Sequence, residues 1–205
     1  MEKLVGAGKT KAVGVSNVRP SFFPLLNNPN LSNPQAQYSK RYLEQLLPHA
    51  TIVPAVNQIE NHPALPQQEI VDLCKEKGIH IMAYSPLGST GGPLLTSEPV
   101  TQIAAKHGVK PSAVLLSYHS GFFFLFFLPK LQMETDEIHA VPRGTTVLAK
   151  SVTPERIREN LDLVELDAED VKLLDDFSQK LTAEGKLTRF VYPPFGVDFG
   201  FPDKS

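Results

Sequence analysis

Two cations and a hydroxyl at the junction of a strand and a helix could bind a phosphate group. Lys150 and Ser151 follow a short apolar, β-branched run, and Arg156 comes about one turn later. Thr153 and Pro154 are residue types expected at a helix N-cap and at the first helical position. A helix N-terminus, an ammonium and a guanidinium fork all favour phosphate oxygens. An ordinary strand-to-helix turn with surface cations explains the stretch equally well, because short motifs often match by chance.

A buried strand and an amphipathic helix must position these side chains. Residues 145–149 are apolar and β-branched, which is typical of a short strand in a parallel sheet. From Pro154 onward, Ile157, Leu161 and Val164 recur at helical spacing and predict one apolar face. We therefore expect the lysine and serine to lie at the carboxyl end of the strand, where the helix begins.

Three earlier stretches predict strands that also end in polar side chains. They are residues 11–17, 52–58 and 79–85. Helices are predicted between and after the strands, at residues 39–47, 66–78, 98–107, 111–118 and 168–180. Alternating strands and helices are typical of a parallel α/β protein, whose functional residues gather at the carboxyl ends of the strands.

The pattern favours a barrel over an open dinucleotide-binding sheet. No G-x-G-x-x-G motif follows the first predicted strand, as a doubly wound dinucleotide fold would require. A closed TIM (β/α)8 barrel needs eight strand–helix units and about 250 residues. The chain has 205 residues, and its pattern accounts for about four units. We therefore predict an α/β fold built as an incomplete TIM barrel.

Composition indicates a soluble globular protein in a reducing compartment. Apolar residues make up 41% of the chain, charged residues 20%, and the net charge is -2. This balance argues against a nucleic-acid-binding or disordered protein. The single cysteine excludes a disulfide framework and a cysteine-based zinc cluster, so no metal site is predicted. The first residues lack a signal-peptide core, and the apolar run 121–128 is too short to span a membrane. A cytoplasmic location is the expectation.

Four motifs resemble the carboxyl-terminal half of the aldo-keto reductases. They are GKTKAVGVSN (8–17), VPAVNQIENHP (53–63), GIHIMAYSPLGS (78–89) and VLAKSVTPERIREN (147–160), in the order of that family. The resemblance implies a partial aldo-keto reductase domain over residues 1–205 that carries strands five to eight of a (β/α)8 barrel. It also implies an NADP(H) cofactor and no nucleic-acid, membrane or metal partner.

The resemblance further implies which residues contact the cofactor. The nicotinamide carboxamide would bind Ser16, Asn17 and Gln58, and the nicotinamide ring would stack on Tyr84, although a strand-end tyrosine is more often a core residue. The remaining expected contacts are Ser85, Leu87 and Ser89 to the pyrophosphate, Lys150, Ser151, Val152 and Arg156 to the 2′-phosphate, and Glu159 and Asn160 to the adenine.

The expected reaction is reduction of an aldehyde or ketone to an alcohol by a complete parent enzyme. In the family an aspartate, a tyrosine acid, a lysine and a histidine from the first four strands perform this chemistry. None of those positions maps onto this chain, so no catalytic residue is assigned and the chain alone is expected to be inactive. The alternatives are a non-catalytic NADP(H)-binding or regulatory fragment and a truncated chain that does not fold, since a half barrel leaves strand edges open.

Two segments interrupt the family pattern. Residues 18–37 and 120–140 each split a motif that would otherwise read continuously, Asn17 into Tyr38 and His119 into Val141. We interpret both as non-native, unstructured insertions that arise from retained introns.

Two further residues could suggest chemistry but have simpler explanations. His62 matches a position near the pocket of the family, yet it follows a strand beside a proline and is expected to be structural. Cys74 lies on the apolar face of the helix predicted at residues 66–78, so it is expected to pack in the core.

Overall fold

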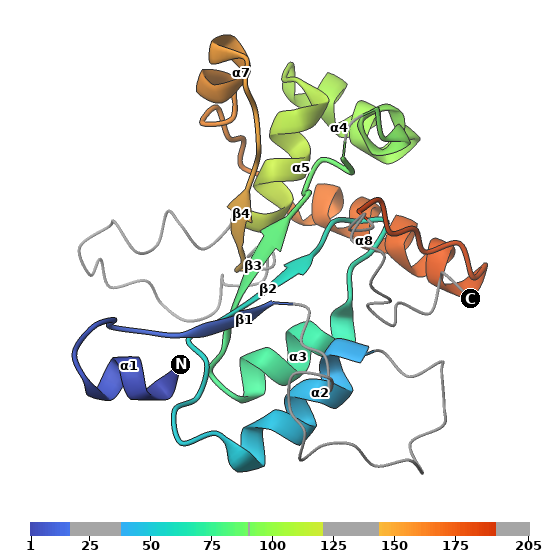
Figure 1. Cartoon of the computed structure of the whole chain (residues 1–205). Coiled ribbons are helices and arrows are strands. Elements are labelled where there is room, and N and C mark those ends of the chain that lie inside the picture. Colours follow the sequence, from blue (N-terminus) through green and yellow to red (C-terminus); the bar gives the residue numbers. More distant parts are fainter. Residues whose placement is uncertain (17–37, 90, 121–143, 192–205) are drawn as a thin grey trace, which may run out of the picture. The chain divides into compact units, whose positions relative to one another are not determined.

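A computed structural model describes residues 1–16, 38–89, 91–120 and 144–191 of the chain (Figure 1). The predicted insertion at 18–37, and the predicted insertion at 120–140 beyond its first residue, lie outside the described residues. Asn17 does too. The helices are α1 (Glu2–Gly6), α2 (Tyr38–Leu46), α3 (Gln68–Glu76), α4 (Glu98–His107), α5 (Pro111–Ser120), α7 (Pro154–Glu159) and α8 (Ala168–Ala183). Short 3-10 turns occur at Leu47–His49 and Pro93–Thr96.

The strands form a parallel sheet, as predicted. They are β1 (Gly14–Ser16), β2 (Val56–Glu60), β3 (His80–Tyr84) and β4 (Thr146–Leu148), in the order β1-β2-β3-β4. β1 pairs with β2 in parallel, and β3 pairs with β4 in parallel. β1, β3 and β4 lie within the segments predicted for them, β2 begins within its segment and extends past it to Glu60, and α4 has the predicted bounds. The α/β class is therefore confirmed for the described residues.

The chain divides into two compact units. The described part of unit 1 comprises residues 1–16, 38–59 and 67–81. In this unit α2 and α3 lie side by side (Figure 1). Its buried core consists of Leu43, Ile59, Ile70, Leu73, Cys74, Ile79 and Ile81. Ile70, Leu73 and Cys74 share one face of α3, as predicted, and Gly78 adopts a positive φ of 68° just after that helix, where a glycine is favoured.

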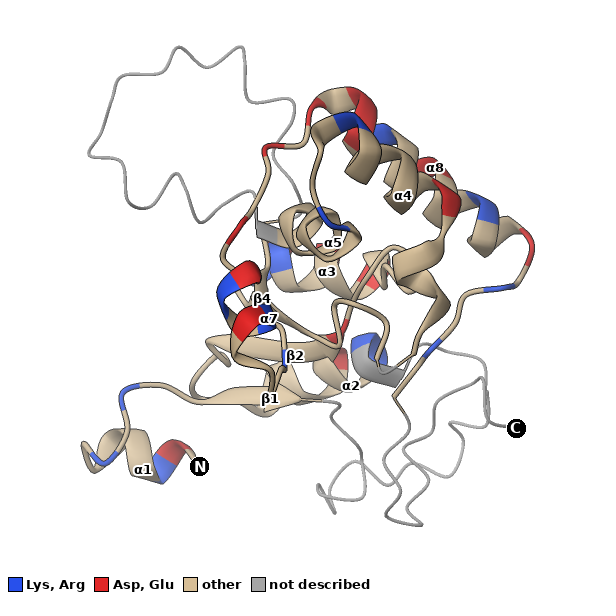
Figure 2. Cartoon of the chain, turned by 90° about the horizontal axis from the view of Figure 1, so that it is seen from above, with Lys and Arg blue, Asp and Glu red and all other residues tan. Residues whose placement is uncertain are grey.

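Unit 2 contains the longer helices and the larger core. Its described residues are 60–66, 82–89, 91–120 and 144–191. α4 packs against both α5 and α8, and the core includes Val100, Ile103, Val114, Leu115, Tyr118, Leu166 and Leu174. Acidic and basic residues are interspersed along α7 and α8 (Figure 2). None of the helices in the described ranges is both long and apolar enough to cross a membrane.

Candidate cofactor-binding site

The parallel pairing of β3 and β4 places two predicted site segments at one edge of the sheet in unit 2. Tyr84, the last residue of β3, is the register partner of Leu148, the last residue of β4. Because the strands run in the same direction, the chain leaves both at the same edge. Ser85 and the cation Lys150 therefore follow neighbouring strand ends, which the sequence predicted.

The loop that follows Tyr84 has an unusual backbone. Ser85 and Ser89 have φ values of 51° and 66°, and Gly88 lies between them at 78°. Left-handed backbone at a residue other than glycine costs about 1–3 kcal/mol and is concentrated at functional sites. The Gly88 N–H donates to the Ser85 carbonyl at 2.9 Å, which closes the turn, and Leu87 packs on the unit 2 core. The loop is thus a tight, well-packed turn of small and hydroxylated residues.

The cations after β4 lie at the protein surface. Lys150 and Arg156 are both exposed, and neither forms an ion pair within the part of the chain that the structure describes. Val152, which lies between them, is 79% exposed. The side chains of Lys150 and Arg156 are therefore available to bind an anion.

Thr153 is the N-cap residue of α7, as predicted, but no side chain among the described residues caps this helix. Thr153 occupies the N-cap position with Pro154 after it, yet the Thr153 side chain makes no cap hydrogen bond. Instead the Thr153 N–H donates to Ser151 Oγ at 3.2 Å. A serine bonding the backbone two residues later is a common local turn. Ser151 is therefore half-buried in the turn that leads into the helix.

The predicted apolar face of the last segment was only partly right. α7 ends at Glu159, and the chain then turns, with the Leu161 N–H donating to the Arg158 carbonyl at 3.0 Å. Ile157 is 51% exposed and Leu161 is 80% exposed, so neither packs in a core. Val164 alone is half-buried; its N–H donates to Ser117 Oγ at 2.9 Å.

The two residues predicted to contact the adenine are held differently from each other. The Glu159 carboxylate accepts a hydrogen bond from the ammonium of Lys110. Asn160 is half-buried, caps the carboxyl end of α7 and donates its N–H to the Arg156 carbonyl at 3.0 Å. Glu159 would have to share its carboxylate between Lys110 and any ligand.

In unit 1 the predicted nicotinamide residues lie on paired strands. Ser16 and Gln58 are register partners in β1 and β2, and Ser16 Oγ donates to the Gln58 carbonyl at 3.0 Å. Ser16 is exposed and Gln58 is half-buried. The structure thus brings this pair together, and separately brings together the strand ends of unit 2.

A buried polar pair lies at the end of β2, and the sequence assigned no role to its carboxylate. Glu60 and His62 are both fully buried, and His62 Nε2 lies 3.2 Å from Glu60 Oε1. The His62 ring also packs against the ring of Phe190, with centroids 5.1 Å apart. Its burial and these two contacts support the structural role predicted for His62. A charged residue at the end of an apolar strand was the signal that could have drawn attention to Glu60.

Cys74 is a core residue, as predicted. Its side chain is fully buried, and Asn57 Nδ2 donates to its sulfur at 3.6 Å. Burial raises the pKa of the Cys74 thiol, because a thiolate is poorly solvated there, and the Asn57 hydrogen bond opposes this only in part. The residue is unsuited to act as a nucleophile.

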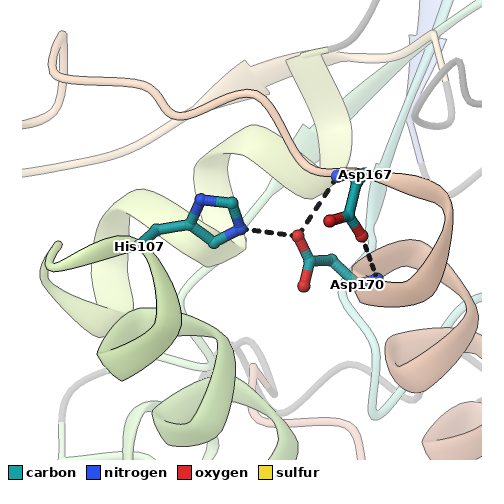
Figure 3. Close-up of side chains that lie close together, drawn as sticks. All are labelled: His107, Asp167 and Asp170. Atoms are coloured by element: carbon teal, nitrogen blue, oxygen red, sulfur yellow. Dashed lines mark hydrogen bonds and ion pairs between the residues drawn. The ribbon is translucent and has the colours of Figure 1, made fainter.

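A second polar cluster, which the sequence reasoning did not identify, joins the end of α4 to the start of α8. His107, Asp167 and Asp170 place their side-chain ligand atoms within 4.8 Å of one another (Figure 3). Asp167 Oδ1 accepts the N–H groups of Glu169 and Asp170, and Asp170 Oδ2 accepts the Asp167 N–H. This reciprocal capping box fixes the first turn of α8.

Lys106 and His107 of α4 contact the remaining acceptors of this cluster. Lys106 Nζ donates to Asp167 at 2.6 Å and to Asp170 at 2.9 Å, and His107 Nε2 lies 2.6 Å from Asp170 Oδ2. Every carboxylate oxygen of the two aspartates therefore has a protein partner already. The cluster is accounted for as a tie between two helices, and we assign no metal to it.

Comparison with known proteins places these observations in one family. A profile of the Aldo/keto reductase family matches residues 1–179. The chain is 58% identical over 205 residues to D-galacturonate reductase of Hypocrea jecorina, which covers 100% of the chain and 53% of that protein. It is 36% identical over 197 residues to glycerol 2-dehydrogenase (NADP(+)) of Saccharomyces cerevisiae, covering 96% of the chain and 50% of that protein.

Solved structures give the same result. An aldo-keto reductase from a Medee basin deep-sea metagenome library superposes with a TM-score of 0.67 at 28% identity, covering 96% of the chain and 56% of the neighbour. A mutant of Gox0644 in complex with NADPH superposes with a TM-score of 0.61 at 27% identity, covering 86% and 50%. The chain spans about half the length of the curated relatives it matches.

Proposed function

Because the chain belongs to the aldo/keto reductase family, we propose that it carries the NADP(H)-binding part of a carbonyl reductase. In this proposal the chain supplies about four strand–helix units of a TIM barrel. The complete parent protein uses NADPH to reduce an aldehyde or ketone to an alcohol. A cytoplasmic location suits that reaction and remains part of the proposal.

The register of β3 and β4 is the observation that carries this proposal. Tyr84 and Leu148 are paired at the ends of the two strands, so the Ser85–Ser89 loop and the cation Lys150 leave the sheet at one edge. In parallel α/β proteins the carboxyl edge of the strands is where ligands bind. In NADP(H) the pyrophosphate and the 2′-phosphate are both attached to the adenosine ribose. The Ser85–Ser89 loop could therefore bind the first while Lys150 and Arg156 bind the second.

The residues present fit an NADP(H) molecule by their chemistry. Lys150 and Arg156 are exposed cations without an ion pair among the described residues, and they would hold the 2′-phosphate. The tight loop from Ser85 to Ser89 would hold the pyrophosphate. Tyr84 would stack on the nicotinamide, and Ser16 and Gln58 would bind its carboxamide. Asn17, Leu87, Ser151, Val152, Glu159 and Asn160 complete the proposed set of contacts.

NADPH supplies the hydride when it is bound, and the chain supplies binding and orientation. The side chains described above neutralise the phosphates and hold the nicotinamide ring. None of them is proposed to protonate the developing alkoxide, which requires an acid of tuned pKa. We therefore propose that this chain binds NADPH without turning it over.

The identity with D-galacturonate reductase suggests the substrate to test first. At 58% identity over 205 residues, this relative is far more similar to the chain than the glycerol dehydrogenase, at 36%. We propose an aldehyde of a sugar acid as the substrate of the parent enzyme.

Titration of the chain with NADPH and with NADH, followed by nicotinamide fluorescence, tests this proposal. We expect NADPH to bind at least tenfold more tightly than NADH. Lys150→Ala and Arg156→Ala should each weaken NADPH binding by about tenfold, the loss of one charge-assisted hydrogen bond, and leave NADH binding unchanged. Arg158→Ala is the matched control, because Arg158 is another exposed arginine of the same helix without an ion pair among the described residues.

Three outcomes would count against the proposal. Equal affinities for NADPH and NADH would contradict the proposed 2′-phosphate site. Absence of binding to either nucleotide by a folded chain would remove the cofactor site altogether. Turnover of D-galacturonate by this chain alone would show that it contains an acid after all.

A further inference from the structure

A short segment after α8 is fastened to the start of unit 2. We call residues 188–191 the strap. The Thr188 N–H donates to the Ala64 carbonyl at 3.0 Å, the Phe190 N–H donates to Glu60 Oε1 at 2.7 Å, and the Val191 N–H donates to Glu60 Oε2 at 3.3 Å. The segment has no regular secondary structure, so these bonds fix its course.

Glu60 is the centre of this attachment. Its side chain is fully buried, and both of its oxygens accept backbone N–H groups of the strap. Arg189 Nη1 lies 3.5 Å from Oε2, and His62 Nε2 lies 3.2 Å from Oε1. A buried carboxylate is tolerated only when donors surround it in this way. The strap and the buried carboxylate therefore stabilise each other.

The strap places an aromatic ring on the loop that follows β3. The Phe190 ring packs against the His62 ring, with centroids 5.1 Å apart and planes tilted by 44°. The ring also lies so close to Gly88 that a Cβ there would come within 3.2 Å of Phe190 Cε2 and 3.0 Å of Leu94 Cβ. Gly88 lies within the Ser85–Ser89 turn and donates its N–H to the Ser85 carbonyl.

We propose that the strap positions the Ser85–Ser89 loop to bind the pyrophosphate. Glu60 holds the strap in place, and Phe190 packs against the loop. This inference rests on the proposed NADP(H) site. Ser85 and Ser89 keep left-handed backbone only where their surroundings enforce it. By holding Gly88 and the core-facing Leu94 in contact, Phe190 keeps the loop in one conformation before the nucleotide arrives. A preformed loop lowers the entropy lost on binding.

The test compares two ligands that differ in their need for this loop. NADPH has a pyrophosphate, whereas adenosine 2′,5′-bisphosphate carries the adenine and the 2′-phosphate but no pyrophosphate. We expect Phe190→Ala and Glu60→Gln each to weaken NADPH binding by about tenfold and to change the affinity for adenosine 2′,5′-bisphosphate by less than twofold. In Glu60→Gln the new amide would face an N–H donor, so the strap is released without a change of volume. Phe190→Leu should restore part of the loss.

Phe177→Ala is the matched control, because Phe177 packs on the same unit 2 core from α8. It should reduce thermal stability and leave the ratio of the two affinities unchanged. Hydrogen exchange of the wild type and Phe190→Ala gives a second readout. We expect the amides of Ser85, Leu87, Gly88 and Ser89 to exchange at least tenfold faster in Phe190→Ala.

The outcomes separate this inference from the proposed function. If Phe190→Ala weakens both ligands equally, or changes neither the NADPH affinity nor the exchange of the loop, the positioning role is wrong and the cofactor site stands. If the wild type binds neither ligand, the proposed function and this inference both fall.

Discussion

Cys74 shows how burial decides the chemistry of a single residue. The side chain is fully buried in unit 1, and burial raises the pKa of its thiol. Since the thiolate is the reactive form, we expect the native chain at pH 8 to react with a thiol reagent at least 100-fold more slowly than a small free thiol. Stopped-flow absorbance with an aromatic disulfide measures the rate.

The same residue provides an internal control in denaturant. Cys74 is the only cysteine, so one thiol per chain should react rapidly once the chain is unfolded in guanidinium chloride. Rapid labelling of the folded chain would contradict the burial of this side chain.

At this scale, the residues that carry local signals could be predicted from the sequence. Lys150 and Ser151 were predicted from the junction of a strand and a helix, and the structure places them there. Glu60 was assigned no role from the sequence. Its role depends on Phe190, which lies 130 residues later, and no local pattern reports such a distant partner.

At the scale of elements, the contacts of Lys106 and His107 in α4 with Asp167 and Asp170 at the start of α8 make the stability of the fold depend on pH. The hydrogen bond from Lys106, aided by the N–H groups of Asp170 and Glu169, lowers the pKa of Asp167 from 3.8 to about 2. Burial alone would raise the pKa of Asp170, but Lys106 and His107 outweigh it and the pKa is lowered. A carboxyl group with a depressed pKa stabilises the fold above its unfolded pKa and loses that contribution as pH falls.

We therefore expect the melting temperature to fall as pH is lowered from about 4 to 2. Asp167→Asn should reduce this dependence, because asparagine still caps a helix but carries no charge to pair with Lys106. Circular dichroism melts at a series of pH values measure the effect. Asp162→Asn is the matched control, since Asp162 is exposed and forms no ion pair among the described residues. Equal slopes in the two variants would contradict the tie.

The helix α7 shows where an element-level prediction fails. Ile157, Leu161 and Val164 have helical spacing, but α7 has 6 residues and stops before Leu161. Periodicity detects which residues could share a face and cannot detect whether anything covers that face. The long helices α4 and α8 were predicted well because their apolar residues also meet a core.

At the scale of the whole molecule, the parallel order of strands could be predicted because each strand has its own apolar run and polar end. The division into two compact units could not, since it depends on contacts between residues far apart in the sequence. Contacts between His119 and Thr145 bear on the predicted insertion at 120–140. The Thr145 N–H donates to the His119 carbonyl at 3.1 Å, and His119 Nδ1 lies 3.0 Å from Thr145 Oγ1. Hydrogen bonds therefore link His119 and Thr145, which lie on the two sides of the predicted insertion at 120–140.

We expect a variant that joins His119 directly to Val141 to fold as well as the full chain. Its melting temperature should be equal or higher, because closing a shorter loop costs less entropy. Differential scanning calorimetry of both chains makes the comparison. Loss of cooperative unfolding in the shortened variant would show that residues 120–140 are part of the native protein. Transcripts that contain both predicted insertions would independently contradict their origin as retained introns.

The link between Glu60 and the strap also has a consequence for biosynthesis. A ribosome adds about 5–20 residues per second, so the 130 residues between Glu60 and Phe190 take roughly 10 s to appear. During that interval the carboxylate has none of the strap's backbone donors and is stabilised best by water. Closure of unit 2 around Glu60 is therefore a late event, which we expect only after residues 188–191 have left the exit tunnel.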